Sequence, residues 1–596
     1  MENQLPQRWD LDVIFPGGSE SEEFASFLRL QETDIAALQA QVAQADLHLE
    51  NKETFLHVVS LVQSLAVRIK QAGAFISCLT AQNVKDESAK QLNGRVKTIS
   101  ASYSAALSSW ELHLLAIDEE KWSALLTEEE LQPIAFSLQE RRRRAKEKLP
   151  AEQEVLASDL AVDGYHAWGD LYNTIVGRIS IEVELDGETK HLSVGQAANL
   201  MSHPDRKVRE HVFAKWQEAW GKETELCAMA LNHLGGFRLA LYRHRGWDSI
   251  LREPLEIGRM QEKTLDAMWQ AINNRKDKLV AYLNRKAKLL GVEKLGWADV
   301  GAPVGSQTKK VSYDEAAAMI VEHFGRFNPN MAQFAQRAFD EAWIEAEDRP
   351  GKRPGGFCTS FPVSQQSRIF MTYAGNASNV STLAHELGHA YHQQVMWHLP
   401  ALTQNYAMNV AETASTFAEM ILADAAVKNA ASDEERLVLL EDKLQSVIAF
   451  FMNIQARFLF EKNFYEKRKQ GLVRAAELDQ LMLDAQKEAY DDALADYEPH
   501  FWASKLHFYI TGYPFYNFPY TFGYLFSMSV YARALQEGES FAAKYDALLQ
   551  DTGRMRVEDL AQKHMGEDMT TVEFWQSAVD LAVADIDEFL SLTEEK

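Results

Sequence analysis

Prolines are scarce in this chain, and their positions limit the folds that it can adopt. Only 15 of the 596 residues are proline, and none lies between Pro16 and Pro133 or between Pro400 and Pro499. Proline disrupts a helix interior, because its ring removes a backbone donor and clashes with the preceding turn. Such long stretches without proline favour long α-helices, and the sequence therefore predicts a mainly α fold.

Helical periodicity is clearest near the amino terminus, and a short alternating segment follows it. Apolar residues recur at helical spacing in successive segments with polar breaks, which predicts helices over residues 21–45, 52–81, 89–116 and 119–148. Alternation replaces this pattern in Ile179-Ser-Ile-Glu-Val-Glu-Leu185, ahead of Asp186-Gly187. That combination is typical of a β-hairpin, which we expect within residues 177–194.

The pattern along the chain predicts two parts. Helical spacing resumes near residue 202 and continues to the carboxyl end, apart from residues 297–312 and a segment shortly before residue 380. We therefore expect an amino-terminal helical lobe over residues 1–200, with the hairpin near 179–193, and a second domain over residues 201–596.

One predicted helix carries the motif His385-Glu386-Leu387-Gly388-His389. At about 100° per residue, histidines four positions apart lie on one helix face, so both imidazoles can reach a single metal ion. Glu386 is rotated only modestly from that face, and its carboxylate can take the proton of a water molecule that attacks a carbonyl. Leu383, Leu387 and Ala390 form an apolar opposite face. The motif indicates peptide hydrolysis with one Zn²⁺ ion.

A catalytic zinc ion usually has three protein ligands and one open position, so a third ligand is needed. His392 lies about 10 Å along the helix from His385, too far to share the ion, and we expect it near the ligands or in the cleft wall. Residues 405–427 are rich in alanine and predict a second helix. This helix offers Glu412, which we favour as the third ligand. Glu419 lies on the same face and is the rival.

The segment before the motif has features of a substrate-binding strand. Pro354-Gly355-Gly356 predicts a turn, and Ile369–Tyr373 alternates well enough for a strand. Such a strand can pair its edge with an extended peptide through main-chain hydrogen bonds, and a purely structural hairpin is the equal alternative. Ser378 or Asn379 is the expected helix cap. The candidate substrate-binding residues here are Gly355, Gly356 and Tyr373.

The motif and its surroundings resemble a known family. The run Ser381-Thr-Leu-Ala-His-Glu-Leu-Gly-His-Ala-Tyr-His392, followed by Glu412-Thr-Ala-Ser, resembles oligoendopeptidases of the F type, in the thimet-oligopeptidase-like group of zinc metallopeptidases. Residues 352–358 and 368–375 resemble that family's glycine turn and the strand before its zinc helix. The metal ligands that match the family motif are His385, His389 and Glu412, and the matching catalytic glutamate is Glu386.

The resemblance implies a fold and a substrate class. Members of the family enclose the zinc ion in a deep channel between two mostly helical lobes, with small β elements beside the zinc helix. Residues 201–596 would form the zinc metallopeptidase catalytic domain. Such a channel admits only short unfolded peptides, so the expected activity is hydrolysis of internal bonds in short peptides.

A downstream stretch, residues 507–524, is dense in phenols and contains two glycines and two prolines, which makes it too irregular for a plain core helix before Tyr520. We call it the aromatic segment. A neutral phenol or imidazole near zinc can donate a hydrogen bond to the oxyanion formed during amide hydrolysis. The resemblance implies this role here, so we expect His507, Tyr516 and Tyr520 to be catalytic and Tyr513 to bind substrate. For each tyrosine, packing is the equal alternative.

The amino-acid composition limits the kinds of partner that this protein can bind. A formal net charge of −25 argues against nucleic acid, because phosphate binding requires a basic surface. The one basic cluster, residues 140–148, is flanked by acids and predicts a solvated helix face. No signal peptide is evident at the amino end, and no apolar run is long enough for a membrane span, so we expect a cytoplasmic location without membrane contact. Three widely spaced cysteines indicate neither disulfides nor a cysteine zinc site.

Two other functions fit the same motif. A zinc carboxypeptidase on a similar helical scaffold would remove single terminal residues. A peptide-binding protein with a structural zinc ion would not cleave at all, but Glu386 and the absence of a fourth ligand in the motif weigh against it. The sequence favours the endopeptidase.

Overall fold

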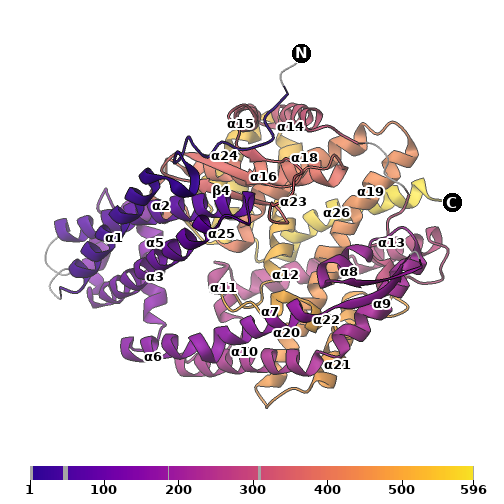
Figure 1. Cartoon of the computed structure of the whole chain (residues 1–596), viewed down its shortest axis with the longest axis horizontal. Helices are drawn as coiled ribbons and strands as arrows, with labels where there is room; N and C mark the ends of the chain where they lie inside the picture. Colours follow the sequence, from indigo (N-terminus) through magenta and orange to yellow (C-terminus); the bar gives the residue numbers. More distant parts are fainter. Residues whose placement is uncertain (1–3, 45–51, 186, 306–309, 595–596) are drawn as a thin grey trace.

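Helices make up most of the molecule, which is described by a computed structural model (Figure 1). The structure describes residues 4–44, 52–185, 187–305 and 310–594. The predicted mainly α fold is confirmed, and the few strands form two small sheets.

The amino-terminal helices lie at the left of Figure 1. They are α1 (Glu22–Val42), α2 (Lys52–Gln82), α3 (Glu87–Ala116), α4 (Glu119–Leu125) and α5 (Ala135–Lys146). The first three match the predicted helices, although Ala45, the predicted end of the first, lies outside the described residues. The prediction of one helix over residues 119–148 is wrong. Helix α4 ends at Leu125, and a 3₁₀ turn that contains Pro133 precedes α5, because proline cannot continue the preceding helical hydrogen bonds.

The middle of the chain continues with helices around the predicted hairpin. They are α6 (Ala151–Ala161), α7 (Ala167–Arg178), α8 (Val194–Leu200), α9 (Arg206–Gly221), α10 (Thr224–Arg245), α11 (Arg252–Ile257), α12 (Glu262–Asn273) and α13 (Lys276–Leu289). The hairpin pairs β1 (Ile181–Leu185) with β2 (Glu188–Leu192) in antiparallel register, Leu185 opposite Glu188. This confirms the predicted strands; Asp186, in the connecting turn, lies outside the described residues.

The carboxyl-terminal half contains the remaining helices. They are α14 (Tyr313–Phe327), α15 (Pro329–Asp340), α16 (Ala377–Met396), α17 (Met408–Ala411), α18 (Thr413–Lys428), α19 (Asp433–Ile448), α20 (Ile454–Arg468), α21 (Ala475–Ala489), α22 (Phe501–Ser504), α23 (Phe518–Glu537), α24 (Phe541–Asp551), α25 (Val557–Met565) and α26 (Val572–Leu592). Short 3₁₀ turns occupy Gly18–Glu20, Gln132–Ile134, Trp297–Asp299, Ala401–Thr403, Leu506–Phe508 and Gly538–Ser540. Two π-helical turns, Val162–His166 and Ala449–Asn453, interrupt the helices before α7 and α20.

The second sheet lies between α2 and α16, which both contact its strands. Its strands are β3 (Ile344–Glu345), β4 (Phe357–Phe361) and β5 (Gln366–Phe370), in the order β3-β5-β4. The strand predicted at Ile369–Tyr373 therefore begins earlier, as β5. It is also the central strand, parallel to β3 and antiparallel to β4. The expectation that this strand offers a free edge to a peptide is wrong; β4 is the edge strand beside α16.

Two buried apolar clusters stabilise the molecule. One contains side chains from Trp9 to Leu138, joined by three residues from the second half of the chain, Phe361, Phe370 and Leu402. The other extends from Ala161 to Phe589. The small sheet thus contributes to the amino-terminal cluster while it packs against α16, and it ties the amino-terminal helices to the helix that carries the metal-binding motif.

The helices around the motif form a connected set. In Figure 1, α14, α15, α16 and α18 lie at the top, α6, α10, α20 and α21 lie at the bottom, and α12, α23 and α26 lie between them. Helix α18 packs against both α16 and α23, and α26 packs against α23 and α12. The motif helix is therefore anchored to the middle of the molecule through α18.

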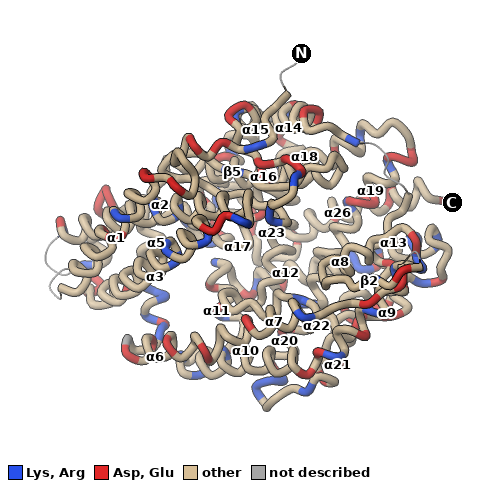
Figure 2. The backbone as a smooth tube through the Cα atoms, in the orientation of Figure 1, with Lys and Arg blue, Asp and Glu red and all other residues tan. Residues whose placement is uncertain are grey.

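The basic cluster of α5 is paired rather than solvated (Figure 2, blue along α5). Arg141 bonds Glu111 at 2.6 Å, Arg142 bonds Glu119 at 3.0 Å, and Arg143 pairs with Glu256 of α11. Arg259 makes a two-pronged bond to Glu140 of α5, at 2.9 and 2.8 Å. The predicted solvated face is therefore wrong, because these side chains join α5 to α3, α4 and α11 and to Arg259 just after α11.

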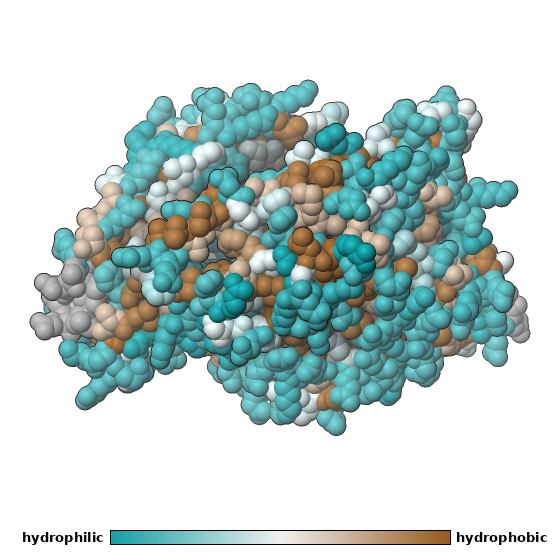
Figure 3. Space-filling model, turned by 90° about the horizontal axis from the view of Figure 1, so that it is seen from below, coloured by the Kyte–Doolittle hydropathy of each residue, from teal (hydrophilic) through white to brown (hydrophobic). Residues whose placement is uncertain are grey.

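The surface is mostly hydrophilic when seen from below, and hydrophobic residues gather across the middle of that face (Figure 3). Four exposed apolar side chains lie close together in the sequence: Val155, Leu156, Leu160 and Val162, each more than half exposed. Among the described residues, every helix falls short of the length and apolarity that a bilayer crossing requires.

Candidate metallopeptidase active site

Helix α16 presents the motif with its apolar side inward, as the sequence predicts. Leu383, Leu387 and Ala390 are completely buried. The N-cap is Asn376, whose side chain accepts a hydrogen bond from the Asn379 N–H at 2.8 Å. The predicted cap, Ser378 or Asn379, is therefore wrong by two or three residues. Asn379 lies inside the first turn, and its side chain instead accepts from the Ala374 N–H at 2.7 Å.

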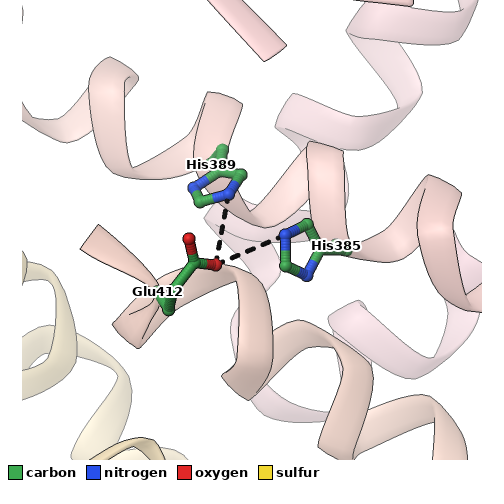
Figure 4. Close-up of side chains that lie close together, drawn as sticks. All are labelled: His385, His389 and Glu412. Atoms are coloured by element: carbon green, nitrogen blue, oxygen red, sulfur yellow. Dashed lines mark ion pairs between the residues drawn. The ribbon is translucent and has the colours of Figure 1, made fainter. Parts of the chain in front are cut away.

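The three predicted metal ligands lie together (Figure 4). The Nε2 atoms of His385 and His389 are each 3.4 Å from Oε2 of Glu412. One ligand atom from each of the three residues lies within 4.8 Å of the others, in a half-buried setting. We call these three residues the metal-ligand group. Figure 4 shows both imidazoles directed toward the carboxylate from the neighbouring helix.

Glu412 stands at a break between two helices. The sequence predicts one helix over residues 405–427, whereas α17 ends at Ala411, Glu412 has φ −84° and ψ 1°, and α18 begins at Thr413. The hydroxyl of Ser415 donates to Glu412 Oε2 at 2.8 Å and so orients the carboxylate. The prediction of a continuous helix is wrong here, because the chain turns at the residue that must reach α16.

Two glycines allow the backbones around Glu412 to approach closely. A Cβ on Gly388 would lie 2.5 Å from the carbonyl oxygen of Ala414, nearer than side-chain atoms occur. A Cβ on Gly523 of α23 would lie 3.0 Å from the Asn409 carbonyl oxygen and 3.1 Å from Glu412 Cβ. Larger residues would push α16 and α23 away from the turn that carries Glu412.

Both histidines are oriented by a second partner. Nδ1 of His385 bonds Glu419, whose other carboxylate oxygen accepts from Ser381. His389 makes a hydrogen bond to the backbone of Ala411. A carboxylate or carbonyl on the far nitrogen is the usual support for a metal-ligating imidazole. Glu419, the rival ligand, is thus placed behind His385 rather than among the three facing atoms.

The electrostatic environment gives the two histidines very different pKa values. Burial lowers the pKa of His385, but the hydrogen bond and charge of Glu419, with Glu412 and Glu386, outweigh it and raise that pKa to about 9. Burial lowers the pKa of His389 to about 4 despite the charge of Glu412. Burial raises the pKa of the Glu386 carboxyl to about 7.

Glu386 lies beside the start of the edge strand. A Cβ on Gly356 would lie 3.5 Å from Glu386 Oε1 and 3.2 Å from the Phe370 carbonyl oxygen, so glycine leaves the chain close to the carboxylate. Gly355 adopts φ +93° with open space around it, a conformation that favours glycine. The predicted glycine turn therefore adjoins the motif helix through Gly356.

Two residues expected near the site are engaged elsewhere. The Tyr373 hydroxyl donates to the Val311 carbonyl oxygen at 3.0 Å, and its side chain is buried. His392 is completely buried; its Nε2 lies 2.9 Å from Thr552 Oγ1, and its ring stacks on Tyr406. The placement of His392 in the cleft wall is therefore wrong, because the side chain points into the packing against α24.

The aromatic segment gathers its predicted donors into one cluster. The ring centre of His507 lies 5.5 Å from that of Tyr516 and 6.1 Å from that of Tyr520. Tyr513 lies 5.7 Å from Tyr516 by the same measure. Burial raises the pKa of Tyr520, and Tyr516 and the charge of Glu412 add to the rise. Tyr520 is therefore within reach of the charge of Glu412, and its phenol keeps its proton at neutral pH.

His507 is neutral in this setting. Burial, together with the charges of Arg457 and Lys505, lowers its pKa to about 4. Its Nδ1 atom is buried without a hydrogen-bond partner among the described residues. The imidazole and the phenols can therefore act as neutral hydrogen-bond donors.

The aromatic segment is held by residues that sequence reasoning missed. Arg238 of α10 and Tyr165 of the first π-helical turn both donate to the Thr511 carbonyl oxygen at 3.1 Å. Glu461 of α20 accepts from the Phe515 N–H at 3.0 Å. Phe515 has φ +53°, a strained conformation for a residue with a side chain. No local pattern marks these supports, because they lie 54 to 346 residues away in sequence.

The donor set of the metal-ligand group fits a zinc ion. Ligand atoms held about 2.1 Å from one ion in a tetrahedral arrangement lie about 3.4 Å apart, which is the distance of each Nε2 from Glu412 Oε2. Two imidazoles and one carboxylate also leave one coordination position open, which is typical of hydrolytic rather than structural sites. The fold and this chemistry define a helical metallopeptidase.

Comparison with known proteins gives the family. Residues 199–581 match the model described as peptidase family M3, and residues 113–180 match the one described as oligopeptidase F. Because the first match covers more than half of the chain, the protein belongs to peptidase family M3, and it is a metalloendopeptidase.

Relatives and solved structures agree with that family. Oligopeptidase PepF of Bacillus subtilis is 24% identical over 608 residues, which cover 99% of this chain and 89% of the relative. An oligoendopeptidase F homolog of Lactococcus lactis is 22% identical and covers 99% of this chain and 98% of its own. A putative peptidase from Chlamydophila abortus shares the fold with a TM-score of 0.83 at 21% identity, covering 98% of each chain. Oligoendopeptidase F from Enterococcus faecium does so at 0.71 and 18%, covering 96% and 99%.

Proposed function

We propose that this metalloendopeptidase is a zinc-dependent oligoendopeptidase that hydrolyses internal bonds of short unfolded peptides. The observation that carries the proposal is that His385 and His389 each lie 3.4 Å from Glu412, with Glu386 on the same helix as the two histidines. The relatives named oligoendopeptidase F support the substrate class.

The metal-ligand group would hold one Zn²⁺ ion through the two Nε2 atoms and the Glu412 carboxylate. A zinc ion bound there would polarise the scissile carbonyl and lower the pKa of water. Glu419 fixes the ring of His385 through Nδ1, and the Ala411 backbone fixes His389, so both Nε2 atoms stay directed at the ion. Ser415 holds the Glu412 carboxylate in place.

Glu386 is the proposed general base. It lies one residue after His385 on α16, and its buried carboxylate is close to the start of β4. It takes the proton of the attacking water and then gives it to the nitrogen of the departing amine. A carboxylate can do both because the amide nitrogen gains basicity once its bond to the carbonyl weakens.

Neighbouring groups are proposed to bind the peptide and stabilise the developing charge. His507, Tyr516 and Tyr520 donate hydrogen bonds to the carbonyl oxygen as it gains negative charge. Tyr513, Gly355 and Gly356 are proposed to contact the peptide, and β4, as the edge strand, is proposed to offer main-chain partners to an extended chain. Tyr373, whose hydroxyl bonds Val311, would act only through its ring.

Selection for short peptides is proposed to follow from a deep channel between two helical lobes, which excludes folded proteins. The upper and lower helices of Figure 1 are the proposed walls. The division of the chain at residue 200 stays a prediction. The amino-terminal part of one buried cluster ends at Leu138, and the other cluster begins at Ala161. The oligopeptidase F match ends at residue 180, and the peptidase family M3 match begins at residue 199. The cytoplasmic location also stays a prediction.

The test is cleavage of a short peptide blocked at both ends, which carries a fluorophore and a quencher. We expect internal cleavage, identified by mass spectrometry of the products, and its loss when a chelator removes the metal. A carboxypeptidase would leave the blocked peptide intact and would shorten an unblocked one from its carboxyl end. A folded protein offered as substrate should remain whole.

Glu386→Gln tests the mechanism within the same assay. The variant should bind zinc stoichiometrically and lose about 100-fold or more of its turnover, because the general base is gone. The matched control is Glu322→Gln, which changes an exposed carboxylate on α14 and should leave turnover unchanged. Wild-type turnover in a zinc-loaded Glu386→Gln protein would refute the proposed role.

A further inference from the structure

Two cations beside the aromatic segment lack a carboxylate partner. Arg457 lies in α20, and Lys505 directly follows α22. The Arg457 guanidinium carbon lies 5.3 Å, and the Lys505 Nζ 4.7 Å, from the ring centre of the same residue, Phe501. Neither side chain forms an ion pair with any carboxylate in the described part of the chain. Two positive charges thus share one phenyl ring without a contacting carboxylate.

Two almost fully buried cations of this molecule are each paired with a carboxylate. Lys286 contacts Glu441 at 2.5 Å, and Arg209 contacts Asp299 at 2.9 Å, with all four side chains almost fully buried. Removing a charge from water is expensive unless an opposite charge and hydrogen bonds replace the water. Arg457 and Lys505 are half-buried and carry part of that cost without a contacting carboxylate. Arg368 also lacks a carboxylate, but it is completely buried and gives its donors to backbone and amide oxygens. Arg457 and Lys505 instead keep donors without a partner among the described residues, where an anion from outside the chain would be stabilised.

Arg457 is held so that part of its guanidinium stays available. Its Nε donates to Asn453 Oδ1 at 2.8 Å, and its Nη1 donates to Asn517 Oδ1 at 3.2 Å. Asn453 ends the second π-helical turn, an irregularity often found at functional sites. Among the described residues, Arg457 Nη2 and Lys505 Nζ have no hydrogen-bond partner, and neither is among the partnerless atoms sealed from solvent.

A neighbouring amide adds a further unused donor. Asn517 is 1% exposed, and its Nδ2 has no partner in the described part of the chain. Glu498, an acid whose charge acts on both cations, is occupied: it accepts from Trp216 Nε1 at 2.7 Å and from Ser504 Oγ at 3.3 Å. Burial and the charge of Arg457 lower the pKa of Lys505 to about 8, against the opposing charge of Glu498.

The cation pair adjoins the proposed catalytic groups. The charges of both cations depress the pKa of His507, after burial. The pKa of Tyr520 responds to Glu412 and also to Arg457, besides burial and Tyr516. Arg457 donates to Asn517 Oδ1 at 3.2 Å, and the Asn517 carbonyl oxygen accepts from the Tyr520 N–H at 3.1 Å. Lys505 precedes His507 by two residues. The cations therefore sit beside His507 and Tyr520, at the edge of the proposed cleft.

We propose that Arg457 and Lys505 form a carboxylate-binding subsite for the peptide substrate. The proposal rests on the proposed peptidase function. The bound group is a carboxylate, either at the carboxyl end of the peptide or on an aspartate or glutamate side chain. The free Nη2 and Nζ donors supply charge-assisted hydrogen bonds, the strongest kind that a protein offers to such a group.

The negative charge of the whole molecule indicates what such a subsite would contribute to substrate binding. With a net charge of −25 the molecule repels anionic peptides at long range. Two unpaired cations next to the cleft reverse that field locally, where screening by water is reduced. The pair would therefore select peptides whose carboxylate lies at a fixed distance from the cleaved bond.

The test compares three forms of one short neutral peptide: the carboxyl-terminal amide, the free acid, and amides with a single glutamine replaced by glutamate. We expect wild-type kcat/KM to be about 10-fold or more higher for an anionic form than for the neutral amide, as expected for hydrogen bonds to a charged group. A preference for the free acid alone identifies the terminal carboxylate. A preference for one glutamate position identifies a side chain.

Lys505→Gln and Arg457→Gln should each reduce that preference by about 10-fold. Lys462→Gln is the matched control, because Lys462 is an exposed lysine on α20, and it should keep the preference. Lys505→Arg, which retains the charge, should keep it as well. Binding of the same peptides to Glu386→Gln protein, measured by fluorescence anisotropy, should show the same order without turnover.

Three outcomes separate the possibilities. Equal wild-type rates on the neutral and all anionic forms, or preferences that survive both glutamine substitutions, would overturn the subsite. Equal losses on neutral and anionic forms would show that the cations only support the fold, and would also overturn it. Absence of metal-dependent cleavage of the neutral amide would instead refute the proposed function itself.

Discussion

The metal-ligand group and the aromatic segment meet at one site, but the chain positions them in different ways. His385, His389 and Glu412 come from α16 and the α17–α18 turn, whose backbones approach so closely that Gly388 cannot carry a Cβ without contacting Ala414. His507 and Tyr513 come from a stretch with little regular structure, followed by α23. Helix packing fixes the first region, and individual polar contacts fix the second.

The two regions also differ in what keeps their side chains in a fixed geometry. Around the metal ligands, each histidine is oriented by a neighbour on an adjacent helix, so the geometry follows from helix packing. Around the aromatic segment, Arg238, Tyr165 and Glu461 bond its backbone at Thr511 and Phe515. Changes in the first region should therefore act through metal affinity, and changes in the second through turnover.

The largest expected effect separates ligand from support in the first region. Glu412→Gln should weaken zinc binding by more than about 1,000-fold, whereas Glu419→Gln should weaken it about 10- to 100-fold, because Glu419 only orients His385. Zinc affinity measured by competition with a chelator gives both values. The reverse order would make Glu419 the ligand and would break the assignment of the metal-ligand group.

The second effect belongs to the aromatic segment. Removing one donor to the developing oxyanion should lower kcat about 100- to 1,000-fold while zinc binding stays intact. His507→Gln, Tyr516→Phe and Tyr520→Phe, compared under saturating peptide, identify which side chain donates. Tyr513→Phe is the matched comparison, with a smaller change expected mainly in KM. Zinc loss in any of these variants would contradict the separation of the two regions.

The sequence predicted the first region better than the second, for a physical reason. His385, Glu386 and His389 form a pattern within one helix, and a helix repeats its geometry closely enough to place both imidazoles on one face. Glu412 was predicted on a continuous helix and stands instead at a helix break. Glu412 was still favoured, because the predicted second helix offered it as an acid near the motif and the resemblance matched the same residue; neither argument depends on its conformation.

The wrong predictions around the site concern features that are determined by contacts with residues distant in the sequence. The alternation before the motif indicated a strand, but pairing with β3 and β4 makes that strand central. Periodicity within one strand carries no information about its neighbours. For the same reason the supports Arg238 and Glu461, and the unpaired cation Arg457, had no signal in the sequence: each acts on a residue at least 54 positions away.

The third prediction uses pH to test how Glu461 supports the aromatic segment. Burial raises the pKa of its carboxyl to about 8, against the Phe515 N–H bond and the charge of Arg238, which lower it. Because the folded value lies above the unfolded one, the folded state holds the proton more tightly. The stability that this adds is present below pH 4.5 and is lost as the pH rises to 8.

Glu461→Gln removes that dependence and keeps an acceptor for Phe515. The free energy of unfolding of the variant, relative to the wild type, should therefore rise with pH by about 2 to 4 kcal/mol between pH 4.5 and 8. Denaturant unfolding at several pH values measures it. Glu466→Gln, on the exposed side of α20, should show no such trend. A flat difference for Glu461→Gln would mean that its carboxyl is ionised in the folded protein.

The smallest effect returns to the packing of the metal-ligand group. Gly388→Ala should destabilise the protein by about 1 to 3 kcal/mol, because the new Cβ meets the Ala414 backbone at 2.5 Å and α16 must move from α18. Gly94→Ala is the control: Gly94 is also inside a helix, α3, but its Cβ would meet nothing within 4 Å. There alanine should stabilise by up to about 1 kcal/mol through helix propensity.

Because α16 carries both histidines, Gly388→Ala should also weaken zinc binding, and thermal unfolding with and without zinc measures the two effects together. If Gly388→Ala destabilised the apoprotein yet left zinc affinity unchanged, the close approach of α16 and α18 would serve stability alone. The metal-ligand group would then depend on individual contacts, as the aromatic segment does, and the contrast between the two regions would disappear.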